Sequence, residues 1–480
     1  MVALSLMASR MNVSFLQELL NSVAEQGRQY LPRSLGGADR EDDINNLALA
    51  LVSSRGEASG VAIAREILQR YRTLSPVDRL AFIRFLARSM QPDADKVTRA
   101  AKAFLDGAST ASIKALQRAV ESPRLEFFRR LNLAPGATAA IVAMRRDLLT
   151  ADDPSVAPVD SDLRHLLMSW FNRGFLVLRR IDWQTPATIL DKIIAYEAVH
   201  EIQGWDDLRR RLDPADRRCF AFFHPSLVDE PLIFVEVALM SDIPGSIGAV
   251  LQQEAPGTGD VDEKPTTAVF YSISNCQEGL RGISFGNFLI KQVVEDLVKE
   301  RPSLKTFVTL SPVPDFAEWL GSVLSDPETD VVAPAERQRL EVLRDPDWVH
   351  SAQVATALKP ILLRLAAHYF LGVKTADGRP LDPVARFHLG NGARLERINW
   401  LGDTSPKGLA EAHGLMVNYR YEVKDIERNH ETYANEGIVA ASRQVHGFLK
   451  PEKARPEARK LLQITGLRAG RGSPGPGESK

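Results

Sequence analysis

Apolar residues recur at helical spacing over the first third of the chain. Between residues 42 and 150 they repeat every three or four positions, and no alternating stretch interrupts them. Ser75-Pro76 places an N-cap residue before a proline suited to the first helical position, and Pro123 is suited to start another helix. The pattern therefore predicts a bundle of about six to eight helices, preceded by one helix over residues 13–29.

The pattern changes after a polar, proline-containing segment, residues 151–161, which is the expected linker. Beyond it, helices are expected at residues 163–172 and 186–200. Short runs rich in apolar and β-branched residues predict strands, at residues 175–179, 218–224, 232–239, 267–273, 305–310, 395–400 and 415–423. A turn is expected at residues 225–231, and one last helix within residues 432–449.

These elements predict an α+β protein with an all-helical domain followed by a mixed αβ domain. The helical domain is expected to span residues 1–160 and the mixed domain residues 161–465. The remaining residues, 466–480, are rich in Gly, Pro and Arg and are expected to be disordered.

One strand–turn–helix unit, residues 266–297, suggests a binding site. Its turn contains Gly279, Gly282 and Gly286. Such a turn aims backbone N–H groups and a helix N-terminus at a bound anion. Arg281 adds a guanidinium group suited to phosphate. Many αβ units have a glycine-rich turn without a ligand, so the pattern alone leaves both interpretations open.

Composition narrows the functional classes. The 480 residues include 60 Lys and Arg against 61 Asp and Glu, so the net charge of −1 predicts no attraction to nucleic acid or to an anionic membrane. No apolar run is expected to span a bilayer, and the N-terminus lacks the features of a secretory or transit signal. Two cysteines, Cys219 and Cys276, exclude a disulfide framework, so a cytoplasmic location is expected. Metal-protease, cysteine-zinc and P-loop patterns are absent from the sequence.

Two polar residues are placed where a side chain can face a ligand. Ser311 ends a predicted strand at a Pro-Val-Pro sequence, where it serves a ligand or caps the turn. His388 ends a short predicted helix directly before a Gly-Asn-Gly turn. Among three further histidines, a role in a turn is favoured for His224 and a role in the core or an interface for His368. The role of His413 is left open.

Four segments resemble the malonyl-CoA decarboxylase family. They are YSISNCQEGLRGISFGNFLIK at residues 271–291, LSPVPDF at 310–316, DPVARFHLGNGARLERINW at 382–400 and GLMVNYRYEV at 414–423. The resemblance implies an N-terminal helical domain that makes contacts in a homodimer or homotetramer. It also implies a C-terminal catalytic domain of the GNAT type, which is the acetyltransferase fold.

The resemblance also implies which residues form the site. The catalytic serine, histidine and tyrosine of the family fall on Ser311, His388 and Tyr421. The loop that binds the CoA pyrophosphate falls on Arg281, Gly282, Ile283, Ser284, Phe285, Gly286 and Asn287. Ser284 stands where acetyltransferases have Gly and where animal decarboxylases of this family carry Glu, so carboxylate chemistry is not expected there.

The implied reaction converts malonyl-CoA to acetyl-CoA and CO2 through an enolate held by backbone N–H donors. His388, titrating near neutrality, is expected to carry the proton to the α-carbon. Ser311 is a polariser, a proton relay or a nucleophile. No metal, biotin or pyridoxal cofactor is required, because CoA belongs to the substrate. A GNAT-type acyl-CoA N-acyltransferase and a non-catalytic CoA-binding scaffold are the alternatives.

Overall fold

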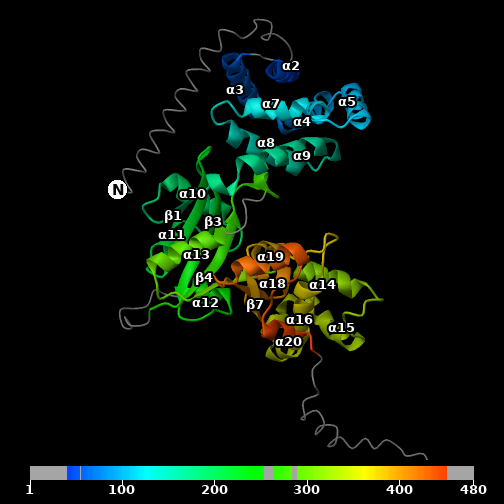
Figure 1. Ribbon diagram of the computed structural model, residues 1–480. Coiled ribbons are helices and arrows are strands. Elements are labelled where there is room, and N and C mark those ends of the chain that lie inside the picture. Colours follow the sequence, from blue (N-terminus) through cyan, green and yellow to red (C-terminus); the bar gives the residue numbers. More distant parts are fainter. Residues whose placement is uncertain (1–39, 54–55, 253–263, 284–288, 451–480) are drawn as a thin grey trace, which may run out of the picture. The chain divides into compact units, whose positions relative to one another are not determined.

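The computed structural model describes residues 40–53, 56–252, 264–283 and 289–450 (Figure 1). The helix expected over residues 13–29 and the tail expected over residues 466–480 lie outside this description. The chain divides into two compact units. The first contains residues 1–244 and 249–309, and the second contains residues 245–248 and 310–480.

The first unit begins with the expected helical region. Its helices are α2 (Arg40–Ser53), α3 (Glu57–Thr73), α4 (Pro76–Ser89), α5 (Ala94–Asp106), α6 (Thr110–Val120), α7 (Pro123–Leu131), α8 (Ala137–Ala151), η3 (Pro154–Val156) and α9 (Ala157–Trp170). Ser75 and Ser122 cap α4 and α7 by accepting hydrogen bonds from backbone N–H groups of the first turn. Phe82, Phe127 and Phe128 are buried in its core.

The linker expected at residues 151–161 is largely helical. Asp153 caps η3 through its side chain, and α9 begins at Ala157 with Pro158 in its first turn. Prolines are compatible with the first turn of a helix because the N–H group they lack has no partner there. The polar and proline-rich composition therefore marks helix starts, and the domain boundary expected near residue 160 stays a prediction.

The first unit continues into a sheet flanked by helices (Figure 1). The elements are η4 (Arg173–Phe175), β1 (Val177–Ile181), α10 (Ala187–Tyr196), α11 (Trp205–Leu212), β2 (Arg217–His224), β3 (Leu227–Met240), β4 (Thr267–Asn275), η5 (Glu278–Leu280), α13 (Leu289–Glu300) and β5 (Thr306–Thr309). Strands β1 to β4 pair antiparallel in chain order, and β5 pairs parallel with β4. The parallel pair requires the crossover through η5 and α13, so the glycine turn lies at the end of β4. The turn expected at residues 225–231 is shorter, because β3 already begins at Leu227.

The second unit surrounds three further strands with helices. Its elements are β6 (Ser311–Pro312), α14 (Phe316–Ser325), α15 (Pro334–Leu340), η6 (Glu341–Arg344), η7 (Pro346–His350), α16 (Ala352–Leu371), α17 (Pro383–Gly390), β7 (Arg394–Asn399), α18 (Pro406–Ala412), β8 (Met416–Arg420), α19 (Ile426–Glu436) and α20 (Arg443–Phe448). The residues of α12 (Ile247–Leu251) are divided between the two units. Strand β8 pairs antiparallel with both β6 and β7.

The predicted fold class, a helical region followed by a mixed αβ part, is confirmed, and the GNAT type of the mixed part stays a prediction. The single last helix expected within residues 432–449 is instead two helices, α19 and α20. They are separated at Gly437, whose φ of +65° ends α19 in the left-handed region.

One helix corrects a prediction made from the sequence. Among the described residues, α16 is long and apolar enough to cross a membrane by length and composition, although no such run was expected. Leu362, Leu365 and Tyr369 of α16 are completely buried within the protein. Burial of this kind is typical of a core helix.

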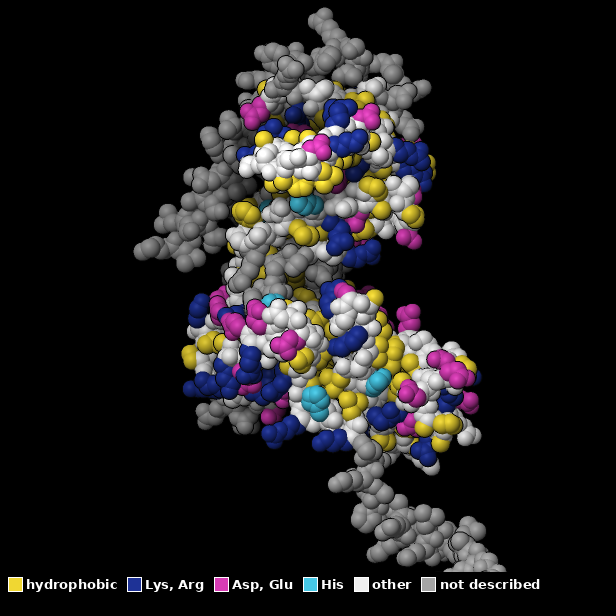
Figure 2. All heavy atoms as spheres, turned by 45° about the vertical axis from the view of Figure 1, so that its right-hand side comes forward, with side chains coloured by type: hydrophobic (Ala, Val, Ile, Leu, Met, Phe, Trp, Pro, Cys, Tyr) yellow, Lys and Arg dark blue, Asp and Glu magenta, His cyan; other side chains and the backbone are white. Residues whose placement is uncertain are grey.

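On the face drawn in Figure 2, acidic and basic side chains are interspersed, which fits the near-equal numbers of the two in the sequence.

Two glycines of the second unit allow a matched test of backbone packing. Gly392 and Gly378 both have positive φ, +81° and +77°. A Cβ atom at Gly392 would lie 2.2 Å from the carbonyl oxygen of Ile426, whereas one at Gly378 would meet nothing within 4 Å. Gly378→Ala should lower the free energy of unfolding by about 1 kcal/mol, and Gly392→Ala by roughly 1–3 kcal/mol more. Urea denaturation measures both losses, and equal losses would contradict the close approach.

Candidate active site

Ser311 and His388 are positioned by short elements of the second unit. Ser311 lies in β6, opposite Val417 of β8, and only 5% of its surface is exposed. His388 lies in the last turn of α17 and is 3% exposed. Asp382 caps that helix by accepting a hydrogen bond from the backbone N–H of Ala385 at 2.6 Å. Because α17 has only eight residues, its cap contributes much of its local stability.

The structure brings Ser311, His388 and Tyr421 together in one hydrogen-bonded array. Ser311 Oγ lies 3.2 Å from His388 Nε2, and His388 Nδ1 lies 2.8 Å from the Tyr421 hydroxyl. Tyr421 follows β8 and is 2% exposed. Both ring nitrogens of the buried imidazole therefore have a partner, as a buried polar group requires.

Burial decides the charge of this array. It lowers the pKa of His388 to about 3, so the imidazole is neutral at neutral pH. Burial also raises the pKa of Tyr421, which stays a phenol. The expectation that His388 titrates near neutrality is therefore wrong, because the side chain has lost the water that would stabilise an imidazolium.

Two arrangements of the protons are compatible with these distances. In the first, Tyr421 donates to Nδ1 and Nε2–H donates to Ser311 Oγ, so that the serine can give its own proton to a ligand. In the second, Nδ1–H donates to Tyr421 and Nε2 accepts the serine proton, which makes Ser311 a nucleophile or a base. The array is thus equipped for proton transfer without carrying a charge.

A neighbour of His388, Tyr419, and a buried acid at the start of the same helix, Asp382, were missed as candidate site residues from the sequence. The Tyr419 ring stacks on the imidazole, with ring centroids 4.6 Å apart and planes 23° from parallel. Asp382 is 1% exposed, and burial raises its pKa to about 7. The sequence did contain a signal for Tyr419. It stands two positions before Tyr421 near the end of a predicted strand, and residues two apart in a strand point to the same face. Asp382 lies in one of the four segments that resemble the family, but no role was expected for it.

The first unit contains the glycine turn expected to bind phosphate. Arg281 and Gly282 are exposed directly after η5, and Gly282 has a φ of +76°, which favours glycine. Ile283 is buried. The other residues expected in the loop, Ser284, Phe285, Gly286 and Asn287, lie outside the described residues.

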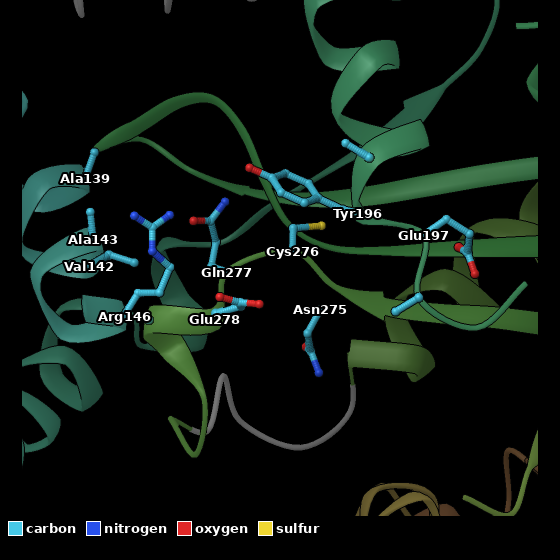
Figure 3. A pocket seen from close by; sticks show the side chains of 13 residues that line it. Ala139, Val142, Ala143, Arg146, Tyr196, Glu197, Asn275, Cys276, Gln277 and Glu278 are labelled. Atoms are coloured by element: carbon cyan, nitrogen blue, oxygen red, sulfur yellow. The ribbon is translucent and has the colours of Figure 1, made fainter. Parts of the chain in front are cut away.

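A cavity of about 450 Å³ lies beside this turn (Figure 3). The side chains of Arg146, Gln277 and Glu278 line it together with Tyr196 and Cys276. No motif in the sequence indicated this cavity, because its walls come from α8, α10 and the end of β4. Among the described residues, no group of three or more His, Cys, Asp or Glu side chains is arranged to hold a metal ion.

The neutral state of His388 predicts a loss of stability in acid. The imidazole has a pKa of about 3 in the folded protein and about 6.5 in the unfolded chain. Between these values only the unfolded chain binds the proton. The contribution of the neutral imidazole to the free energy of unfolding is therefore complete above about pH 6.5. It is lost as the pH falls toward about 3. Thermal denaturation at about pH 7 and about pH 5 should show a smaller decrease of Tm in His388→Gln than in the unchanged protein.

Replacement of an exposed histidine, His446→Gln, is the control and should keep the pH dependence of the unchanged protein. An equal decrease of Tm in His388→Gln and the unchanged protein would show that burial of this imidazole carries no such cost.

Comparison with known proteins identifies relatives over both parts of the chain. A model of the malonyl-CoA decarboxylase N-terminal domain matches residues 90–171, and a model of the C-terminal domain matches residues 174–459. The mitochondrial malonyl-CoA decarboxylase of Anser anser anser is 41% identical over 347 residues, which cover 67% of this chain and 68% of that protein. The corresponding protein of Rattus norvegicus is 38% identical over 342 residues, or 66% of this chain and 69% of that protein.

Solved structures agree with these relatives. The crystal structure of malonyl-CoA decarboxylase from Rhodopseudomonas palustris has a TM-score of 0.80 and 54% identity, and the match covers 85% of this chain and 99% of that one. The structure of the Agrobacterium vitis protein has the same TM-score and identity and is covered completely. The resemblance noted in the sequence is thus confirmed, and the chain belongs to the malonyl-CoA decarboxylase family.

Proposed function

We propose that this protein is a carboxy-lyase that converts malonyl-CoA to acetyl-CoA and CO2, with Ser311, His388 and Tyr421 delivering the proton. The observation that carries the proposal is the buried array in which His388 contacts a serine on one side and a tyrosine on the other. Membership of the family supports the reaction, and the geometry of the array supports the roles of the residues.

The chemistry of decarboxylation suits an uncharged array. When the bond to the carboxylate breaks, its electron pair moves into the thioester and forms an enolate. Backbone N–H groups aimed at the thioester oxygen would stabilise that charge. The α-carbon of the enolate is then a strong base, so a neutral donor is acidic enough to protonate it. A dry site also favours loss of the carboxylate charge, because the charged ground state is poorly solvated.

The proton can pass along the array in balanced steps. Ser311 gives its proton to the α-carbon, Nε2–H of His388 replaces it, and Tyr421 gives its proton to Nδ1. Solvent then restores the proton of Tyr421. The same contacts would allow Ser311 to orient the carboxylate or to act as a nucleophile. Kinetic measurements on variants of Ser311 and His388 test these roles.

The loop from Arg281 to Asn287 is proposed to bind the CoA pyrophosphate. The exposed guanidinium of Arg281 and the left-handed Gly282 before α13 support this placement, because they leave positive charge and backbone accessible to an anion. Malonyl-CoA itself supplies the CoA group, so no separate cofactor is proposed.

The protein is further proposed to be a homo-oligomer in the cytoplasm, without nucleic-acid or membrane partners. The two buried free thiols, Cys219 and Cys276, suit a reducing compartment.

The direct test is release of CO2 from malonyl-CoA by the purified protein. Formation of acetyl-CoA and CO2 in equal amounts, without a second substrate, is the expected result. Turnover only when an amine acceptor is added would instead indicate an N-acyltransferase. Binding of CoA without any turnover would indicate a non-catalytic scaffold.

Variants of the array should lower kcat far more than they change KM. His388→Gln and Ser311→Ala should each reduce kcat by about a hundred- to ten-thousand-fold, because a positioned proton donor is worth that much. The double variant should lose less than the product of the two effects, since the residues act as a unit. His413→Gln replaces a half-buried histidine of the second unit and is the control. Fully multiplicative losses would argue against a coupled relay.

Activity should survive exhaustive treatment with EDTA, because every step proposed here is assigned to a side chain or to the backbone. Decarboxylase assays before and after chelation measure this. A loss of turnover that a divalent cation restores would overturn the metal-free mechanism.

A further inference from the structure

Arg145 is a buried arginine of α8 that reaches out of the helical region. Only 1% of its surface is exposed. Its Nε donates to Asp160 Oδ1 of α9 at 2.8 Å, and its Nη1 donates to the carbonyl oxygens of Gly279 and Arg281 at 2.7 and 2.9 Å. A buried charge is costly unless it is paired and hydrogen-bonded. These contacts satisfy Arg145 and, at the same time, hold two carbonyl groups of one turn.

The turn held by Arg145 is the one before the proposed pyrophosphate loop. The two carbonyl groups belong to Gly279 and Arg281, the residues on either side of Leu280. Arg145 therefore ties the end of η5 to α8 at two points. Leu280, Arg281 and Ile283 also donate backbone hydrogen bonds within the turn, to Gln277, Glu278 and Leu280 respectively. The direction in which the chain leaves Arg281 therefore depends on a side chain more than one hundred residues away in sequence.

A second contact between α8 and the turn is independent of Arg145. A Cβ atom at Gly279 would lie 1.9 Å from the carbonyl oxygen of Val142, so the turn approaches α8 as closely as a glycine allows. Figure 3 shows Val142, Ala143 and Arg146 on one side of the adjoining cavity and Gln277 and Glu278 close to them. The helical region thus forms part of the surroundings of this turn.

We propose that Arg145 is a positioning residue for CoA binding, through which the helical region sets the conformation of the phosphate-binding turn. The inference rests on the proposed function, because it requires that the loop from Arg281 bind a diphosphate. Arg145 itself is buried and does not contact the ligand. Its role is to hold the backbone at Arg281 and Gly282 so that the Arg281 guanidinium is in place for the anion before it arrives.

This role makes a specific kinetic prediction. Loosening the turn should weaken binding of the CoA moiety and leave the chemical step unchanged, since Ser311, His388 and Tyr421 belong to other elements. Arg145→Lys keeps the positive charge beside Asp160 but loses the planar fork that serves the carbonyl oxygens. The variant should raise KM for malonyl-CoA, and the dissociation constant of free CoA measured by calorimetry, by about tenfold, with kcat within about twofold.

Arg124 provides a matched control. It is also a buried arginine of the helical region, it pairs with Asp162 at 2.7 Å, and it donates to the carbonyl oxygens of Leu86, Ala87 and Met90. None of these contacts involves the turn. Arg124→Lys should lower Tm by a similar amount while leaving KM and CoA affinity as they are. A rise in KM in both variants would show a general effect of destabilisation and would overturn the inference.

Hydrogen exchange keeps the test decisive if Arg145→Lys is poorly stable. The amide groups of Leu280, Arg281 and Ile283 should exchange faster in Arg145→Lys than in Arg124→Lys when the two are compared at equal distances below their Tm. Equal exchange at these amides would overturn the inference without any activity measurement.

Arg281→Ala separates failure of this inference from failure of the proposed function. If Arg281→Ala weakens CoA binding and Arg145→Lys does not, the phosphate site stands and the positioning role is wrong. If neither variant changes CoA affinity, the phosphate site itself lies elsewhere and both ideas fall. When both are correct, the double variant should lose less affinity than the product of the single losses, because Arg145 acts through Arg281.

Discussion

The burial of His388 is the constraint on which the second unit depends. An imidazole without access to water must be neutral, and both of its nitrogens need partners. Three elements meet this requirement together: α17 carries the imidazole, β6 provides Ser311, and the chain after β8 provides Tyr421. Tyr419 covers the face of the ring. Movement of any one element would leave a buried polar atom without its hydrogen bond, so the requirement for satisfaction fixes the elements in one arrangement.

A neutral site also fits the chemistry of this family. An imidazolium beside a malonyl carboxylate would attract the group that has to leave as neutral CO2, whereas an uncharged, water-excluded site favours its loss. The proton needed afterwards goes to carbon, and a chain of hydroxyl and imidazole groups can supply it. In the proposed mechanism, the low pKa of His388 keeps the array uncharged at neutral pH.

The first unit uses the same principle at a different place. Arg145 can be buried because its N–H groups donate hydrogen bonds to Asp160 and to two carbonyl groups of the turn before Gly282. The helical region thereby reaches the turn at the end of β4. The close packing of Gly279 on α8 adds a steric constraint to the electrostatic one, so the conformation of the turn is determined jointly by the helical region and the sheet.

Local chemistry in the sequence determined the starts of α4 and α7, the strand β4, and the glycine turn with Arg281, because caps, prolines, alternation and positive φ act within a few residues. The helical character of residues 151–161 and the division of the last helix at Gly437 were missed, since proline and glycine signals have more than one meaning. The resemblance indicated Ser311, His388 and Tyr421 but not their contacts. Only the tertiary structure decided that they meet, that His388 is neutral, and that Arg145 holds the turn, because burial and hydrogen bonding between distant segments depend on how the whole chain packs.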